Sequence, residues 1–207
     1  MTLGTLAWFA LAAIASVAFV VIAAELRTLA LHRLDVAIEL SIHRLDSPVA
    51  DAVMTAATGI GTNWVLIPVV AVVALLALRR RRRIVAIVLA LDTAVVIGAC
   101  NALKVMFARE RPRLFDKIAL PTSYSFPSGH AMSALAIYGV VAAALIALYP
   151  LDRGPRRLAI GGAALLIATI GLSRIYLGVH WPSDVAGGFL GGVPPLIASV
   201  HAIHRGR

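Results

Sequence analysis

Runs of apolar residues long enough to cross a lipid bilayer constrain this chain more than any other feature. A helix needs about 20 residues to cross the hydrocarbon core. Six runs approach that length, near residues 4–24, 61–78, 84–103, 129–149, 157–173 and 182–202. Only 14% of the 207 residues are charged, against about 25% in soluble domains. The sequence therefore predicts an all-α membrane protein, a single domain over residues 1–207 built as a bundle of six transmembrane helices.

One amphipathic pattern separates the first two spans. Leu34, Ile38 and Ile42 recur at helical spacing, with Asp35 and Glu39 on other faces. This pattern is typical of a helix that lies in the membrane interface. A helix packed on the outer ends of the spans is the alternative.

The orientation follows from the basic residues in the links between spans. Five consecutive arginines, Arg79–Arg83, join spans two and three, further arginines lie at 153–157, and Arg205 and Arg207 follow the last span. The positive-inside rule assigns these links to the cytoplasm. We therefore expect a multi-pass protein of the plasma (inner) membrane with both termini inside. The net charge of +9 lies between apolar runs rather than along one polar face, which argues against nucleic-acid binding.

The predicted topology places three polar segments at outer ends of spans. In the first, Lys104 ends span three and Arg111-Pro112 follows. Arginine offers planar, bidentate donors to phosphate and lysine a point charge, so these residues suit phosphate binding. The same stretch holds further cations: Arg109, Arg113 and Lys117. Side chains that reach up to lipid headgroups are the alternative.

The second segment is Pro127-Ser128-Gly129-His130, at the start of span four. Ser128 is a good N-cap, and Gly129 allows a ligand to approach the backbone. A helix N-terminus attracts anions, which would place His130 beside a bound anion. An ordinary capped helix start is the alternative.

The third segment, residues 173–184, joins spans five and six. Pro182 is suited to the first turn of a helix, which brings Asp184 within reach of His180. A carboxylate there fixes the imidazole tautomer, and Arg174 adds a cation, so the group suits nucleophilic attack on an anionic substrate. Alternatively, His180 and Asp184 only satisfy each other.

In these residues the chain resembles the type 2 phosphatidic acid phosphatases (PAP2), which share their site with vanadium haloperoxidases and bacterial acid phosphatases. The family signature is K-x6-R-P, then P-S-G-H, then S-R-x5-H-x3-D. This sequence matches each part in order: Lys104-x6-Arg111-Pro112, Pro127-Ser128-Gly129-His130 and Ser173-Arg174-x5-His180-x3-Asp184.

The resemblance implies a role for each matched residue. His180 would attack phosphorus to give a phosphohistidine, Asp184 would orient it, and His130 would protonate the leaving oxygen. The phosphate oxygens would be held by Lys104, Arg111, Arg174, the Ser128 hydroxyl and the Gly129 N–H. No cofactor or metal ion is implied, and the sequence has no Asp, Glu or Cys cluster with metal-ligand spacing.

The implied function is hydrolysis of a lipid phosphate monoester or diphosphate on the outer face. Phosphatidic acid, phosphatidylglycerol phosphate and a polyprenyl diphosphate such as undecaprenyl diphosphate all fit. Two alternatives stay open: a phosphotransferase that uses the same histidine, and a non-enzymatic membrane transporter or scaffold. A transporter should carry polar residues through the midplane, where only Asp92 lies.

Two further features concern the bundle itself. We expect Asp92 to be a structural group, protonated or hydrogen-bonded, that faces the other helices. Gly187, Gly188, Gly191 and Gly192 form two small-xxx-small pairs, which favour close packing within the bundle. The sequence leaves open both a homodimer through these glycines and a monomer.

Overall fold

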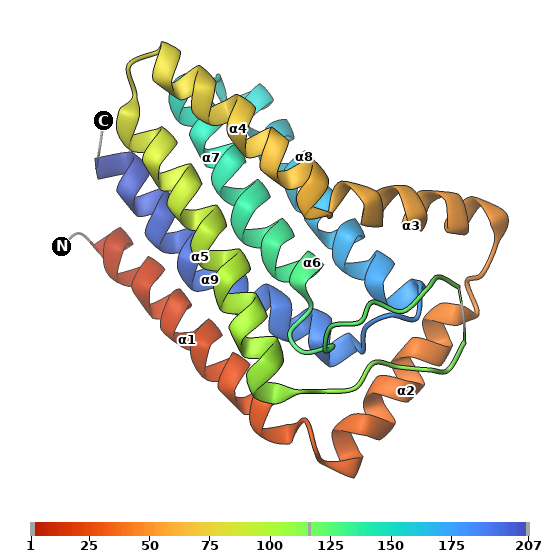
Figure 1. The fold of residues 1–207 in the computed structure, drawn as a ribbon. Helices are drawn as coiled ribbons and strands as arrows, with labels where there is room; N and C mark the ends of the chain where they lie inside the picture. The colour runs from red at the N-terminus through yellow and green to blue at the C-terminus, as the bar shows by residue number, and fades with distance from the viewer. Residues whose placement is uncertain (1–2, 116, 206–207) are drawn as a thin grey trace.

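The computed structural model describes residues 3–115 and 117–205, which form helices and loops without strands. Arg207 lies outside the described residues. Five segments are long and apolar enough to cross a membrane. Four are single helices, α1 (Leu3–Glu25), α5 (Arg83–Phe107), α8 (Arg153–Tyr176) and α9 (Pro182–Arg205), and the fifth joins α6 (Gly129–Ser133), a π-helical turn (Ala134–Tyr138) and α7 (Gly139–Leu148). They run side by side in Figure 1.

The second predicted span differs from the expectation. It corresponds to α4 (Asn63–Arg79), which has only 17 residues. A helix that the sequence did not predict, α3 (Pro48–Ile60), precedes it at an angle of 53°. The sequence patterns therefore overlooked this bend, and the described residues hold five candidate spans, or six if the bent α3–α4 pair counts as one.

Helix α2 (Leu29–His43) forms where the amphipathic pattern predicted it, but its polar face points inward. Asp35 and Glu39 are 1% and 0% exposed, whereas Leu34 is 55% exposed. This orientation is reversed from that of a helix on a soluble protein, because the interior here is a polar site and the apolar face can meet lipid.

Helix α9 packs against much of the bundle through its glycines. A Cβ on Gly188 would lie 2.6 Å from the Ser128 carbonyl oxygen, and one on Gly192 would lie 2.9 Å from that of Met132. These glycines therefore pack α9 against α6 within the chain. Asp92 of α5 also faces α9 and accepts a 2.6 Å hydrogen bond from the Ser199 hydroxyl, as a structural group would.

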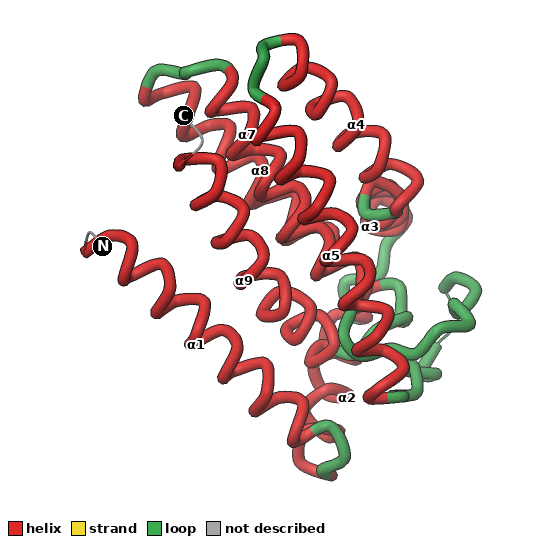
Figure 2. The backbone as a smooth tube through the Cα atoms, turned by 60° about the vertical axis from the view of Figure 1, so that its left-hand side comes forward, coloured by secondary structure: helices red, strands yellow, loops and turns green. Residues whose placement is uncertain are grey.

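The loops gather at the two ends of the bundle (Figure 2). The long loop between α5 and α6 and the link between α8 and α9 lie beside α2 at one end (Figure 1). Both termini lie at the other. Every residue predicted to act on phosphate belongs to the α2 end.

Candidate active site

The three polar segments meet at one place. Arg111 Nη1 lies 3.0 Å from His180 Nε2, and the Ser128 N–H donates to the Asp184 carbonyl oxygen over 2.9 Å. Ser128 also caps α6, because its hydroxyl accepts from the N–H of Ala131. Lys104 comes from the last turn of α5 and Arg174 from the last turn of α8. The helix ends thus place all eight predicted site residues in one cluster: Lys104, Arg111, Ser128, Gly129, His130, Arg174, His180 and Asp184.

His180 and Asp184 form a buried pair, 2% and 0% exposed. Their Nδ1 and Oδ2 atoms are 3.4 Å apart, and the Trp181 N–H donates to the same Oδ2 over 2.9 Å. A carboxylate beside Nδ1 favours the tautomer that is protonated there. The lone pair then belongs to Nε2, the ring nitrogen that faces Arg111.

Burial and the neighbouring cations keep the His180 ring neutral. Burial, first, and then the cations Arg111, Arg174 and Lys104 hold the pKa of His180 well below its ordinary value of 6.5. A neutral ring has a free lone pair at neutral pH, which a nucleophile requires.

The three predicted phosphate-binding cations are close together, and much of their hydrogen-bonding capacity is directed at loop carbonyls. Lys104 Nζ donates to Tyr124 O over 2.6 Å, and Arg111 Nη1 donates to Val179 O over 2.6 Å. Two nitrogen atoms are different: Arg174 Nε and His130 Nε2 are buried and have no hydrogen-bond partner among the described residues. Such atoms are rare in folded proteins and indicate a place for a ligand or water.

Two residues near the bend between α3 and α4 also belong to the cluster. Arg174 donates a hydrogen bond to the Thr58 hydroxyl. A Cβ on Gly61 would lie 2.8 Å from His130 Cδ2 and 2.6 Å from Ile170 Cγ2, so only glycine allows this approach. Sequence reasoning missed both residues, because they lie more than 40 residues before Lys104, the nearest residue of the signature.

An ion-pair network surrounds Asp184. Arg109 joins its Oδ1 over 2.6 Å and Asp35 Oδ2 over 2.8 Å. Ser183 donates to both oxygens of Asp35, through its N–H over 2.8 Å and its hydroxyl over 2.6 Å. Arg109, which the sequence grouped with phosphate-binding cations, therefore holds carboxylates instead. Asp35 was missed because nothing in its spacing connects α2 with the start of α9.

Lys117 also differs from its expected place among the phosphate-binding cations. Its Nζ lies 2.5 Å from Asp46 Oδ1 and 2.6 Å from Asp51 Oδ1. These pairs tie the α5–α6 loop to the start of α3.

Glu39 lies behind this network with both carboxyl oxygens buried and unpaired in the part of the chain that the structure describes. Burial, first, and then Asp35 and Asp184 raise its pKa from 4.5 to about 8. A buried carboxyl with this pKa is neutral at pH 7, which avoids a further negative charge beside Asp184.

We expect Glu39→Gln to make the protein more resistant to heat at alkaline pH. The unfolded chain ionises this residue near pH 4.5 and the folded chain only near pH 8, so the folded state loses stability as the pH rises between these values. The substitution removes this cost, a few kcal/mol at most. Melting temperatures in detergent at pH 4 and pH 8.5 test it, with the exposed Glu25→Gln as control. A gain of equal size at both pH values would contradict the assignment.

Comparisons with known proteins agree with this geometry. A model of the PAP2 superfamily matches residues 81–206. Phosphatidylglycerophosphatase B of Bacillus subtilis is 31% identical over 173 residues, 83% of this chain and 84% of the relative. An undecaprenyl-diphosphatase of Sulfolobus acidocaldarius is 35% identical over 138 residues, 64% of this chain and 60% of the relative.

Solved structures extend the likeness to the fold. The crystal structure of a transmembrane PAP2-type phosphatidylglycerolphosphate phosphatase from Bacillus subtilis has a TM-score of 0.86 and 28% identity, and the match covers 91% of this chain and 93% of that one. Aquifex aeolicus LpxE has a TM-score of 0.61 and 27% identity, over 81% and 95% of the two chains. The family match over more than half of the sequence and the 31% identical relative show that the chain belongs to the PAP2 superfamily.

Proposed function

We propose that this protein hydrolyses a phosphate monoester or diphosphate of a membrane lipid through a phosphohistidine at His180. The observation that carries the proposal is the largely buried cluster in which two histidines, three cations and a carboxylate meet at one end of the helix bundle. The names of the relatives support the substrate class, because they are phosphatases of phosphatidylglycerophosphate and of polyprenyl compounds.

In the first step, His180 Nε2 attacks phosphorus and the bond to the leaving oxygen breaks. His130 donates a proton to that oxygen. The developing charge on the other phosphate oxygens is stabilised by Lys104, Arg111 and Arg174, with the Ser128 hydroxyl and the Gly129 N–H. Water then attacks the phosphorus of the phosphohistidine and gives a proton to His130, the P–N bond breaks, and phosphate leaves with Nε2 restored. Because three cations supply the field, we propose that no metal ion takes part.

Asp35 and Arg109 act in this scheme as positioning residues for Asp184. Arg109 occupies Oδ1 of Asp184, and Trp181 N–H and His180 share Oδ2. Asp35 in turn fixes Arg109 and Ser183. The carboxylate that orients His180 is therefore held through Arg109 by α2, a helix that carries no signature residue.

The proposal places the reaction at the outer face of the plasma membrane, because the site lies at the end of the bundle opposite the Arg79–Arg83 link and the termini. The substrate would enter from the lipid and the phosphate would leave to the outside. Transfer of the phosphoryl group to another acceptor would use the same first step. That acceptor would need a binding site of its own, whereas water does not, so we favour hydrolysis.

Release of phosphate by the purified protein tests the proposal. The panel contains phosphatidic acid, phosphatidylglycerol phosphate, undecaprenyl diphosphate and a soluble nitrophenyl phosphate, each with and without excess EDTA. We expect turnover of at least one lipid, unchanged by EDTA. Strict dependence on magnesium would contradict a metal-independent reaction. Loss of phosphate from the lipid without release of free phosphate would contradict hydrolysis.

We expect Asp35→Asn to lower kcat by about 10- to 100-fold and to leave KM within about threefold. The change removes a charge from a residue that does not touch substrate, so it acts on the orientation of His180 rather than on binding. Asp46→Asn, at an acid outside this network, is the control. A rise in KM alone, with kcat preserved, would show that Asp35 affects binding instead.

We expect Gly61→Ala to lower kcat/KM by about tenfold or more, because the new Cβ would push against the His130 ring and Ile170 and misplace the general acid. Gly59→Ala is a matched control two residues away, where a Cβ would meet nothing within 4 Å. Equal activity of the two variants would mean that the contact with His130 relaxes without cost.

A further inference from the structure

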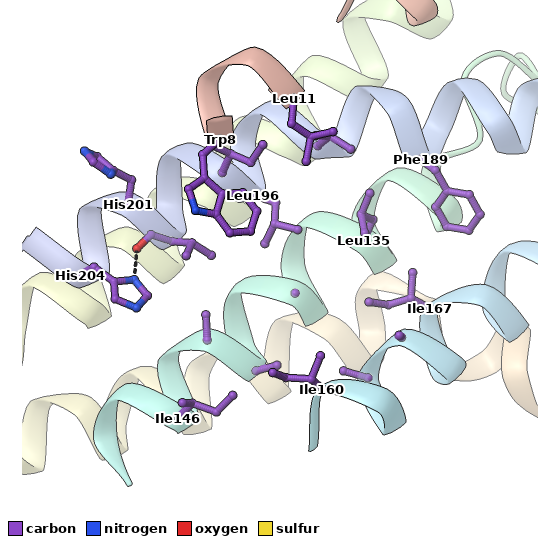
Figure 3. Close-up of a pocket in the computed structure, with 18 of the residues that line it drawn as sticks. Trp8, Leu11, Leu135, Ile146, Ile160, Ile167, Phe189, Leu196, His201 and His204 are labelled. Carbon is purple, nitrogen blue, oxygen red and sulfur yellow. Dashed lines mark hydrogen bonds between the residues drawn. The ribbon is translucent and has the colours of Figure 1, made fainter. Parts of the chain in front are cut away.

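A cavity of about 980 Å³ lies between α1, α7, α8 and α9. Trp8 and Leu11 of α1 stand on one side of it, and Ile146 and Ile160 on the other (Figure 3). The space exists because the residues that could fill it are small: Gly139, Ala142, Ala143, Ala163, Ala164 and Ala168.

The cavity is apolar along its length and polar at one end. Leu135 and Phe189 line the end nearer the active site, whereas Arg156, His201 and His204 line the other. His204 follows Asp184 by 20 residues on the same helix, which amounts to about 30 Å. The polar end therefore lies far from His180, on the side of the membrane that the arginine-rich links occupy.

The cavity is open to its surroundings, because Trp8 and Leu11 on its α1 side are 56% and 47% exposed and Ile160 on its α8 side is 49% exposed. In a membrane, an apolar recess of this kind presents its lining to whatever surrounds the protein. Water is a poor occupant of an apolar cavity, because it needs several polar partners. Hydrocarbon chains surround a membrane protein and match the lining.

The polar end of the cavity favours an anionic headgroup on the molecule whose hydrocarbon chain fills the rest. Arg156 is a permanent cation with bidentate donors suited to phosphate. His201 is held against the Phe9 ring, with 5.6 Å between ring centroids, which fixes α1 beside this end. Basic pockets between transmembrane helices on the cytoplasmic side are where anionic lipid headgroups bind.

We propose that this cavity is a binding site for one anionic phospholipid of the inner leaflet, with its phosphate at Arg156 and one acyl chain between α1 and α8. The lipid would fill the gap between two helices that each pack against other parts of the bundle. The site is separate from the phosphatase site in place and in chemistry, because its ligand is a phosphodiester that stays intact.

Binding of two matched lipids to the purified full-length protein in detergent tests the headgroup. Dioleoyl phosphatidylserine and dioleoyl phosphatidylcholine share their acyl chains and differ in net charge. Native mass spectrometry should give an affinity about tenfold higher for phosphatidylserine. Arg156→Gln should remove the preference. Arg157→Gln, at an exposed neighbour that does not line the cavity, should keep it.

A second pair of variants tests whether the acyl chain of the lipid lies in the cavity. Ala164→Phe should fill the cavity and weaken the binding of both lipids at least about tenfold, whereas Ala159→Phe, at an exposed residue of α8 that does not line the cavity, should leave it unchanged. Melting curves confirm that each variant is folded.

Five results would overturn the proposal. Four are equal affinities for the two lipids, loss of the preference in Arg157→Gln, unchanged lipid binding in Ala164→Phe, and a dimer mass that disappears in Ala164→Phe. The last would assign the cavity to a second copy of the chain. If Ala164→Phe instead raised only the KM for a lipid substrate, the cavity would belong to the substrate tail.

Discussion

His180→Ala is expected to lower kcat by at least about 10³-fold on every substrate. The substitution removes the atom that attacks phosphorus, and neither the phosphate-binding cations nor His130 can replace it. The ring is buried and faces Arg111, so its loss also leaves a gap beside that guanidinium. Melting temperature and detergent gel filtration should therefore accompany the rate, to separate lost chemistry from lost folding.

Trapping of the intermediate distinguishes the nucleophile from a binding residue. Wild-type protein quenched during turnover of ³²P-labelled substrate should carry an acid-labile, base-stable phosphoryl group, as a phosphohistidine does. His180→Ala should carry none. His130→Ala should still be labelled by a substrate with a good leaving group, because its nucleophile is intact. Labelling of a folded His180→Ala protein would assign the attack to another residue.

The clustering of the residues that we propose to contact phosphate was predictable from the sequence, because short segments fix each of them. His180 and Asp184 lie four residues apart across a helix start, and Ser128 caps the helix that begins at Gly129. Local geometry of this kind is encoded by spacing. The segments lie at the end of span three, at the start of span four and between spans five and six. Successive spans cross in opposite directions, so these three places fall on one side of the membrane and the cluster follows from the topology.

The residues that hold the cluster were not predictable in the same way. Asp35 and Thr58 reach it through the tertiary placement of α2 and α3, and no spacing records that placement. Periodicity identified the two faces of α2 but not which of them is buried, because a membrane protein can turn apolar residues toward lipid. The bend at Gly61 was missed for a related reason, since hydropathy detects hydrocarbon thickness rather than the path of the helix.

The third and fifth predicted spans were shorter than their helices, because hydropathy detects only the part of a helix that crosses the hydrocarbon. The third span was expected at 84–103, and α5 extends to Phe107. The fifth was expected at 157–173, and α8 runs from Arg153 to Tyr176. Helices continue through the polar headgroup region, where arginine and lysine are favourable. The additional turns are the ones that carry Lys104 and Arg174, so the site is built on helix ends that project beyond the apolar core.

The loss of activity in His130→Ala is expected to depend on the leaving group, and to be larger when that group must be protonated to leave. His130 Nε2 is buried without a partner among the residues described, as a group would be that donates to a substrate oxygen. A lipid alcohol leaves as a poor alkoxide, so for an alkyl phosphate the loss should be about 10²- to 10⁴-fold. Nitrophenolate leaves without such help, and the same variant should then lose about tenfold or less.

Comparison of His130→Ala with His180→Ala on both substrates makes this test specific. The measurement is kcat/KM for an alkyl phosphate and for nitrophenyl phosphate, read as differences in activation free energy. For His180→Ala the two losses should be equally severe, since the attacking atom is absent in both reactions. For His130→Ala they should differ by at least about tenfold. Equal losses in His130→Ala, with chemistry shown to limit the rate, would mean that this ring binds phosphate and that another group or water protonates the leaving oxygen.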